Sequence, residues 1–531
     1  MRRNRLIVTL LLLAAGAIAG GWFVQRALRR PSQSPVSGLH LLASVMERVR
    51  DSYVDSLAVD ELWRRAAIGM VEELNDPNST YLPPDRLKKL TEATTGLYSG
   101  VGIQADRREG YVVVLAVRPN SPAEHAGIQA GDRLVEADGQ PMKGWTMEEA
   151  RNAMRGVPGS MLRLVVERGT ARIPYQLQRG EIHVSSISRS VILDGGVGYA
   201  LLSTFSDSAR QELTRTVDSL VKAGARSLIL DLRNNPGGLL NQGVGIADLF
   251  LDKGQEIVDV RSRGQKHEQV FVDSAAQRWP QLPVAIIVNA GTASAAEIVA
   301  GALQDHDRAA VLGRRSYGKG SAQNVFELEG GGGLKLTTAR WFTPSGRSIS
   351  RVVRSADSLP LPIDDRPERR PVCKTDAGRK VFGGGGISPD LLVGDSVPLP
   401  AERTFILSLG ASAGKFRETV NDFAAGAVRS GMMKDTAFVV TPVMRENLYA
   451  MLVARHLDVP RNAFNDASGL VDRQLGNELA RQAFGLNFAG RRVTRNDKVV
   501  QRAAALLREA TDPRALLAKL PSAVDSGAQK Q

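Results

Sequence analysis

Cysteine is almost absent from this chain, since Cys373 is the only one among 531 residues. A single thiol can form neither an intrachain disulfide nor a cysteine-bound metal cluster. Zinc-finger spacings and RNA-recognition motifs are missing as well. We therefore expect no disulfide framework and no cysteine-based metal cluster.

Acidic residues are missing from residues 1–30, which contain six arginines. These arginines supply six of the formal net charge of +13, and the remaining +7 is spread over 501 residues. Nucleic-acid-binding domains concentrate their positive charge on one face or stripe. The dilute charge of this chain argues against a nucleic-acid partner, and the arginines flank a targeting segment instead.

That segment, Leu6 to Val24, has nineteen uncharged and mainly apolar residues, about the length that crosses a hydrocarbon core. Residues 17–19 (AIA) would suit signal-peptide cleavage, whereas Trp22-Phe23-Val24 prolong the apolar run as in an uncleaved anchor. We favour a signal-anchor, and both alternatives export the rest of the chain. The expected location is the cell envelope, either anchored to the inner membrane and facing the periplasm or extracytoplasmic space, or exported after cleavage.

The chain is too long for one hydrophobic core, so several domains are expected. Short β-rich runs between turn residues fill 96–180, and strand patterns alternate with helix patterns in 181–395, which predicts an α/β core. The predicted organisation is a signal-anchor or signal peptide with basic flanks (1–30), a linker (31–38), a helical N-terminal region (39–95), a β-rich domain (96–180), the α/β core (181–395) and a helical C-terminal region (396–531).

The sharpest chemical motif is VNAGTASAAE, residues 288–297. An apolar strand pattern ends there at a glycine, and a helix of small residues begins near Ser294. A serine in that place lies at the positive end of the helix dipole, among free backbone N–H groups. A nucleophile beside an oxyanion hole needs this environment, but serine is also a preferred helix cap. From this segment alone, both roles stay open.

A serine nucleophile needs a base, and histidine is the first candidate. His306 is the nearest histidine in sequence, but twelve residues along one helix span roughly 18 Å. Lys319 is the better candidate, because it stands between Gly318 and Gly320 directly after a predicted strand. Glycines let the backbone approach closely, and burial favours the neutral amine that a base requires.

Gln323 follows the lysine by four residues, and its amide could hold the amine by a hydrogen bond without fixing a positive charge. The alternative is an exposed residue of a strand. The preceding segment, residues 313–320 (GRRSYGKG), nearly matches the phosphate-binding motif G-x-x-x-x-G-K-[ST]. However, Gly320 replaces the hydroxyl that would hold magnesium, and Ser321–Leu328 has a strand pattern where a phosphate loop needs a helix. We therefore reject a nucleotide site.

A third motif, DLRNNPGG at residues 231–238, ends a predicted strand in a proline–diglycine turn. Bare N–H groups in such a turn can point into a site. Beside Ser294, the turn would offer a second oxyanion donor.

These motifs, with SYGKGSAQ, TARWFTPSGRSI and GGGGISPD, lie between residues 231 and 390 in the order found in carboxyl-terminal processing (tail-specific) proteases. The chain resembles that family. The resemblance implies Ser294 as the nucleophile, Lys319 as the general base and Gln323 as the residue that orients the lysine.

The resemblance also implies an oxyanion hole formed by the N–H groups of Gly238 and Ala295, with Gly237 as the alternative first donor. One departure from the family pattern is Ala296, where the family often has serine. This position neighbours the nucleophile without carrying the reaction, so we expect activity to survive.

Residues 96–180 resemble a PDZ domain of the permuted bacterial kind, whose carboxylate loop captures a peptide C-terminus through backbone N–H groups. The peptide would add as a strand between Ile103-Gln104 and a helix predicted over Met147–Met154. The alternative is a β-rich scaffold with a vacant groove. The expected peptide-binding residues are Gly100, Val101, Gly102 and Ile103.

Taken together, the resemblance implies a multidomain α/β protein with a ClpP/crotonase-like protease core, an inserted β-rich PDZ domain and flanking helical regions. It implies a serine endopeptidase that cleaves exported proteins with free C-termini by acyl transfer, without metal or organic cofactor. The alternative is a catalytically inactive, membrane-anchored PDZ adaptor. Expected partners are protein or peptide substrates and the membrane, and a homo-oligomer or an activating adaptor is left open.

Overall fold

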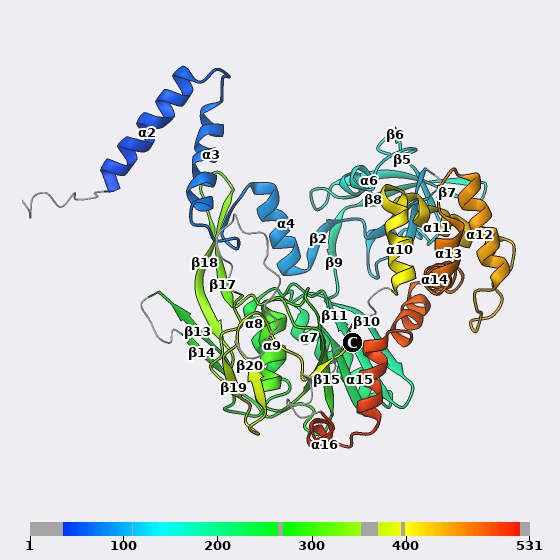
Figure 1. Ribbon diagram of the computed structural model, residues 1–531. Coiled ribbons are helices and arrows are strands. Elements are labelled where there is room, and N and C mark those ends of the chain that lie inside the picture. The colour runs from blue at the N-terminus through cyan, green and yellow to red at the C-terminus, as the bar shows by residue number, and fades with distance from the viewer. Residues whose placement is uncertain (1–34, 109, 264–268, 352–369, 395–398, 521–531) are drawn as a thin grey trace, which may run out of the picture. The chain divides into compact units, whose positions relative to one another are not determined.

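The computed structural model describes residues 35–108, 110–263, 269–351, 370–394 and 399–520 (Figure 1). The chain divides into two compact units between Tyr81 and Leu82. The apolar segment Leu6–Val24 lies outside the described residues. Within the described ranges, no helix combines the length and apolar character that a membrane crossing requires.

The first unit contains two helices, α2 (Pro35–Ser52) and α3 (Val59–Glu72). Asp60 and Glu61 lie in the first turn of α3, where negative charge stabilises the helix dipole. Helical spacing of apolar residues predicted this segment as helical. The second unit begins with α4 (Pro84–Thr95), which ends at Gly96 in the left-handed conformation.

A six-stranded sheet forms the centre of the second unit, in the order β10-β11-β12-β15-β16-β21. All neighbours from β11 to β21 pair in parallel, and only β10 runs antiparallel to its neighbour. This mixed α/β architecture confirms the predicted fold class at the coarse level. The strands are β10 (Ile187–Leu193), β11 (Val197–Leu202), β12 (Ser227–Asp231), β15 (Val284–Val288), β16 (Ala310–Gly313) and β21 (Leu391–Leu392).

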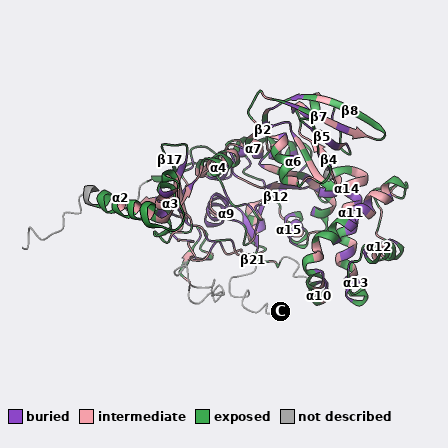
Figure 2. Cartoon of the chain, turned by 90° about the horizontal axis from the view of Figure 1, so that it is seen from above, coloured by how far each residue is buried: buried purple, intermediate pink, exposed green. Residues whose placement is uncertain are grey.

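Both faces of this sheet are buried, since every residue of its central strands β12 and β15 is buried and most of these residues are apolar. Alternate residues of β12 and β15 belong to two different hydrophobic clusters. The first cluster also contains residues of α7 (Ala209–Lys222), α8 (Leu240–Ala247) and α9 (Ala295–Asp305). Every residue of α9 is buried, and Figure 2 shows that helix in purple along its length. The strand and helix predictions for this region are confirmed.

The opposite face of the sheet is covered by α15 (Lys498–Arg508) and α16 (Pro513–Leu517). The apolar side chains of α15 pack on Ile229, Ile287 and Leu312. Helix α15 therefore belongs physically to the α/β core, although it lies more than a hundred residues beyond its last strand. The other C-terminal helices share a separate core; they are α10 (Pro400–Leu409), α11 (Ala413–Arg429), α12 (Pro442–Ala454), α13 (Arg461–Asp466) and α14 (Ser468–Arg495).

A second sheet of the core contains β13 (Glu256–Ser262), β14 (Gln269–Val272), β17 (Ser321–Glu327) and β18 (Gly333–Phe342). Strand β13 pairs with β14 and β18, and β17 pairs with β18, all antiparallel. The predicted strand after Lys319 is thus confirmed as β17. A small hairpin, β19 (Val372–Lys374) with β20 (Lys380–Phe382), completes the strands of the core.

The module at 96–180 is a β-rich domain with its own hydrophobic core. The chain enters and leaves it through β2 (Leu97–Gly100) and β9 (Gly180–His183), which pair with each other. Its sheet has the order β3-β4-β5-β7-β8, with β6 on β5. The strands are β3 (Ile103–Arg108), β4 (Tyr111–Val117), β5 (Arg133–Ala137), β6 (Gln140–Pro141), β7 (Met161–Arg168) and β8 (Ala171–Gln178).

Two helices accompany this sheet, α5 (Pro122–His125) and α6 (Met147–Met154). Helix α6 was predicted over the same residues and begins with a capping box between Thr146 and Glu149. It contacts β3, which lies at the edge of the sheet.

The packing of α15 against the sheet leads to a testable prediction. Leu507 is 2% exposed against the sheet, so Leu507→Ala should lower the free energy of unfolding by about 2–5 kcal/mol through a cavity. Leu407→Ala is the matched control, because Leu407 is 73% exposed and should change stability by less than about 0.5 kcal/mol. Denaturant titration measures both. Equal stability of the two variants would contradict a structural role for α15.

Candidate active site

Ser294 occupies a strained turn between β15 and α9, with φ 57° and ψ −120°. A non-glycine residue in such a conformation costs about 1–3 kcal/mol and marks functional positions. The N–H of Glu297 donates to the Ser294 carbonyl, and the Ser294 side chain makes no capping hydrogen bond to the helix. The hydroxyl is therefore not used as a helix cap, and the side chain is only partly buried.

The DLRNNPGG turn lies directly against this serine. The N–H of Ala293 donates to the Asn235 carbonyl at 2.9 Å, and Thr292 Oγ1 donates to the Leu232 carbonyl at 2.8 Å. A Cβ atom added to Gly237 would meet Ser294 Cβ at 2.8 Å, so only glycine permits this approach. The structure thus brings together two motifs that lie more than fifty residues apart.

Two backbone N–H groups beside the serine keep their hydrogen-bonding capacity. Among the described residues, neither Gly238 nor Ala295 donates its N–H to a protein acceptor. The N–H of Gly237, in contrast, donates to Asn235 Oδ1 at 2.8 Å. Gly237 is therefore wrong as the alternative oxyanion donor, and Gly238 with Ala295 stays the predicted pair.

Lys319 reaches the same place through the loop after β16. The N–H of Tyr317 donates to the Thr292 carbonyl at 2.9 Å. A Cβ on Gly318 would meet the Gly386 nitrogen at 2.8 Å, which explains the glycine before the lysine. Lys319 itself is partly buried.

A buried carboxylate, Glu297, connects the serine and lysine loops. Its Oε2 accepts the N–H of Ser294 at 2.8 Å and the N–H of Lys319 at 2.9 Å. Because both backbone nitrogens bond the same oxygen, the main chains of Ser294 and Lys319 lie close together. Oε1 accepts the Gly318 N–H at 2.7 Å and the Ser316 hydroxyl at 2.5 Å. Burial raises the pKa of the Glu297 carboxyl, and these four donors oppose that shift.

Sequence reasoning missed Glu297, although a signal was present. Helix α9 reads AAEIVAGALQD, and Glu297 is the single charged residue in its small, apolar first two turns. A charged residue on such a helix is rarely buried unless it is fully hydrogen-bonded. The pattern therefore indicated a buried, fully satisfied carboxylate beside the candidate nucleophile.

Gln323 lies on β17 and is partly buried. Its Nε2 donates to Ser321 Oγ at 2.9 Å and to Thr337 Oγ1 at 3.2 Å. These two bonds fix the amide nitrogen on the strand pair β17–β18 and leave the amide oxygen as the acceptor for a further donor.

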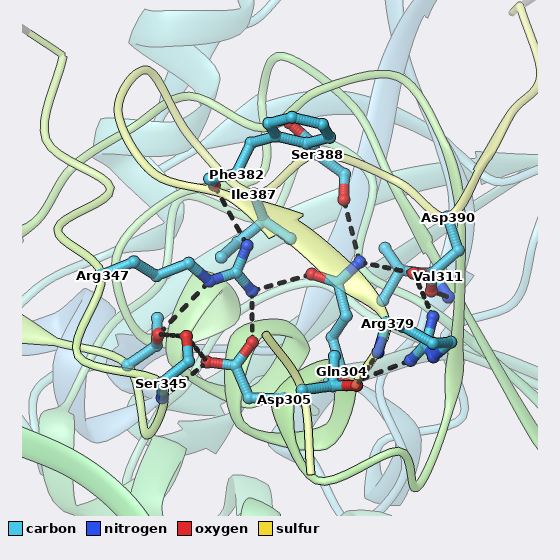
Figure 3. A network of polar contacts seen from close by, with 12 residues as sticks. Gln304, Asp305, Val311, Ser345, Arg347, Arg379, Phe382, Ile387, Ser388 and Asp390 are labelled. Atoms are coloured by element: carbon cyan, nitrogen blue, oxygen red, sulfur yellow. Dashed lines mark hydrogen bonds and ion pairs between the residues drawn. The ribbon is translucent and has the colours of Figure 1, made fainter. Parts of the chain in front are cut away.

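The far end of α9 is fixed by a network of polar side chains (Figure 3). Arg347, which is fully buried, bonds Asp305 at 2.6 Å and Gln304 at 2.8 Å. Gln304 also donates to Asp390, which in turn accepts from Arg379 at 2.6 Å. The network holds segments 343–347 and 379–390 to the end of α9.

The lysine loop also bonds two residues on or near these segments, Arg351 and Ile387. The Arg351 N–H donates to the Gly318 carbonyl at 3.0 Å, and the Ile387 N–H donates to Ser316 Oγ at 2.6 Å. His306 lies at this same far end, where it contacts Asp376 and the Glu256 carbonyl. It is separated from Ser294 by the whole of α9, as the sequence predicted.

The predicted carboxylate loop of the β-rich domain runs from β2 to β3. Val101 is 1% exposed, and neither its N–H nor that of Gly102 has a protein acceptor among the described residues. Gly102 has φ +84°, and a Cβ there would meet Ser121 Cβ at 2.2 Å. Gly100 bridges Arg155, the residue after α6, and Ile103 begins the edge strand β3. Two free N–H groups thus lie between the edge strand and the helix.

Comparison with known protein families gives a match for the α/β core and another for the β-rich domain. Residues 196–355 match the model of peptidase family S41, and residues 113–168 match that of the PDZ domain. The carboxy-terminal-processing protease of Bartonella bacilliformis is 35% identical over 339 residues, 62% of this chain and 77% of that protein. The chain belongs to this family. It is a serine-type peptidase with a PDZ domain.

Two further proteins are similar to this chain. The carboxy-terminal processing protease CtpA of Bacillus subtilis is 34% identical over 311 residues, which cover 58% of this chain and 66% of that protein. Among solved structures, the photosystem II D1 C-terminal processing protease is 26% identical, with 68% of this chain and 94% of that chain covered at a TM-score of 0.36. Ser294, Lys319 and Gln323 all lie inside the S41 match.

No group of three or more histidine, cysteine or acidic side chains in the described ranges could hold a metal ion.

The position of Glu297 predicts a specific defect. In Glu297→Gln the amide NH₂ would oppose N–H donors that now point at a carboxylate oxygen. Two buried donors without acceptors should lower the free energy of unfolding by about 2–4 kcal/mol, and peptide cleavage should fall at least tenfold because both loops shift. Denaturant titration and initial rates measure these effects. Glu327→Gln, at the exposed end of β17, is the control and should match the wild type. Wild-type cleavage by Glu297→Gln would show that the carboxylate does not position the loops.

Proposed function

We propose that this peptidase cleaves with a Ser294/Lys319 dyad. The observation that carries the proposal is the shared hydrogen-bond acceptor, Glu297 Oε2, which holds the backbone N–H of both residues. With both main chains on one oxygen, the two side chains start from adjacent positions. Glycines on both sides of Lys319 leave no neighbouring side chain in sequence to crowd the lysine.

The reaction is acyl transfer followed by hydrolysis. The neutral Lys319 amine takes the hydroxyl proton as Ser294 Oγ attacks the scissile carbonyl. The tetrahedral oxyanion is stabilised by the N–H groups of Gly238 and Ala295. The lysine then returns the proton to the leaving amine, and water hydrolyses the acyl-enzyme by the reverse sequence. The Gln323 amide oxygen orients the amine as an uncharged hydrogen-bond acceptor.

The substrates we propose are proteins that present a free C-terminus to the PDZ domain. The free N–H groups of Val101 and Gly102 support carboxylate capture, and the edge strand β3 beside α6 supports strand addition. An inactive adaptor would use the same groove, but no observation favours loss of catalysis over an intact dyad.

We also propose a ClpP/crotonase-like class for the protease core, supported by the parallel strands β11-β12-β15-β16 and the helices on one face of them. We also propose, from the sequence alone, that the segment Leu6–Val24 directs export and that the protein acts in the cell envelope. The domain boundaries predicted from the sequence remain predictions.

Removal of either dyad member should abolish cleavage. Ser294→Ala and Lys319→Ala should each lose several orders of magnitude in kcat with an unchanged unfolding midpoint, because nucleophile and base act as one unit. Peptide cleavage and circular dichroism on the same samples measure this. Lys335→Ala, on β18, is the control for a lost lysine charge. Normal turnover by folded Lys319→Ala would rule out the dyad.

The carboxylate loop makes a separate prediction. Gly102→Ala places a methyl group on Ser121, so it should raise the KM of a substrate with a free C-terminus and affect a C-terminally amidated substrate less. Gly127→Ala is the matched control, because Gly127 has φ +82° but open space around it. The two variants share backbone strain and differ only in the steric clash. Equal KM values for free and amidated substrates with the wild type would refute C-terminal capture.

A further inference from the structure

Helix α15 contributes more than a cover for the sheet. Its residues Val499, Val500 and Leu507 are at most 2% exposed, and they pack on β12, β15 and β16. The N-terminus of α15 is therefore fixed relative to the ends of the strands that carry the catalytic loops.

The N-cap residue of this helix, Asp497, uses its two carboxylate oxygens for two different purposes. Oδ1 caps α15 by accepting the N–H groups of Val499 and Val500 at 2.9 and 3.0 Å. Oδ2 accepts Arg233 Nη1 at 2.8 Å. Capping alone needs only the first oxygen, so the contact with Arg233 is an additional function of this side chain.

Arg233 belongs to the DLRNNPGG turn and is held from both sides. Its Nε and Nη2 bond the carboxylate of Asp231 at 3.0 and 2.6 Å, and Asp231 also accepts the Tyr199 hydroxyl at 2.9 Å. The exposed fractions of the Arg233, Asp231 and Asp497 side chains are 15%, 1% and 24%. These two carboxylates raise the pKa of Arg233, so the guanidinium stays charged. Partly buried, charge-assisted bonds of this kind hold their geometry well.

The residues that follow Arg233 lead directly to the oxyanion donor. Asn234 has φ 56°, and its N–H donates to Asn289 Oδ1 at 2.9 Å. Asn235 accepts the Ala293 N–H and, through Oδ1, the Gly237 N–H. Gly238 comes next. A shift of Arg233 would therefore move the strained turn that aims the Gly238 N–H.

We propose, on the basis of the peptidase function proposed above, that Asp497 is a positioning residue for the oxyanion hole. Helix α15 thereby takes part in catalysis: it fixes Arg233, and through it the turn that presents Gly238. The contact between Asp497 and Arg233 should therefore stabilise the transition state, with its developing oxyanion, more than it stabilises the bound substrate.

Substitution of Asp497 by asparagine separates its role as the cap of α15 from its ion pair with Arg233. Asparagine caps helices about as well as aspartate but offers Arg233 no charge. Asp497→Asn should lower kcat about tenfold, since small misplacements of positioned groups cost up to about 100-fold. KM should stay within about twofold and the unfolding midpoint unchanged. The affinity for a peptide aldehyde, whose adduct with Ser294 places an oxygen in the hole, should fall about as much as kcat.

Asp512→Asn is the matched control. Asp512 caps α16 in the same way, by accepting the Ala515 N–H, but its other carboxylate oxygen accepts the hydroxyl of the adjacent Thr511 in place of a guanidinium. This variant should keep wild-type kcat and aldehyde affinity. Arg233→Lys should reproduce the kcat loss, and the double variant Arg233→Lys/Asp497→Asn should lose no more than Arg233→Lys alone, because both act through one contact.

The possible outcomes are distinct. Wild-type kcat and aldehyde affinity in Asp497→Asn, an equal loss in Asp512→Asn, or multiplicative losses in the double variant would each overturn the positioning role. If Asp497→Asn does not fold, Arg233→Lys and its aldehyde affinity decide the question. Failure of the wild type to cleave any peptide, or cleavage by Ser294→Ala, would instead refute the proposed function.

Discussion

The buried carboxylate of Glu297 is the interaction on which the rest of the active site depends. A carboxylate in an apolar interior is costly unless donors surround it, and here the donors are backbone and hydroxyl groups of the Ser294 and Lys319 loops. The cost of burial and the alignment of the loops are therefore linked. Any displacement of the serine or lysine main chain leaves a buried charge under-satisfied, so the arrangement resists small distortions.

Helix α9 transmits this constraint along its length. Its first turn carries Glu297, and its last turn carries Asp305, whose bond to the buried Arg347 fixes the segment before Arg351. The lysine loop thus bonds Glu297 and, separately, the backbone N–H groups of Arg351 and Ile387. Because all residues of α9 are buried, the helix cannot shift without disturbing both ends. Close packing makes such an element rigid.

The Ser294 loop and the DLRNNPGG turn are joined by a different set of contacts. Asn234, Asn235 and Thr292 exchange hydrogen bonds with the opposing loop, and Arg233 ties the turn to α15. The three loops of the site are therefore supported by three elements: the parallel sheet, α9 and α15. The PDZ domain, with a core of its own, supplies peptide-binding groups without being part of this support.

The sequence by itself determined the local features of this protein. Strand and helix patterns around β12, β15, β16 and α9 were readable because buried parallel strands are continuously apolar. Ser294, at the start of a helix of small residues, and the glycine-flanked Lys319 stood out from equally local patterns. Only the tertiary structure decided which groups support them. It excluded Gly237 as a donor by giving its N–H to Asn235, and it assigned Glu297 to both loops. It also brought Asp497 to Arg233 across 264 residues. Such contacts depend on how distant segments pack, and no local pattern of residue types encodes them.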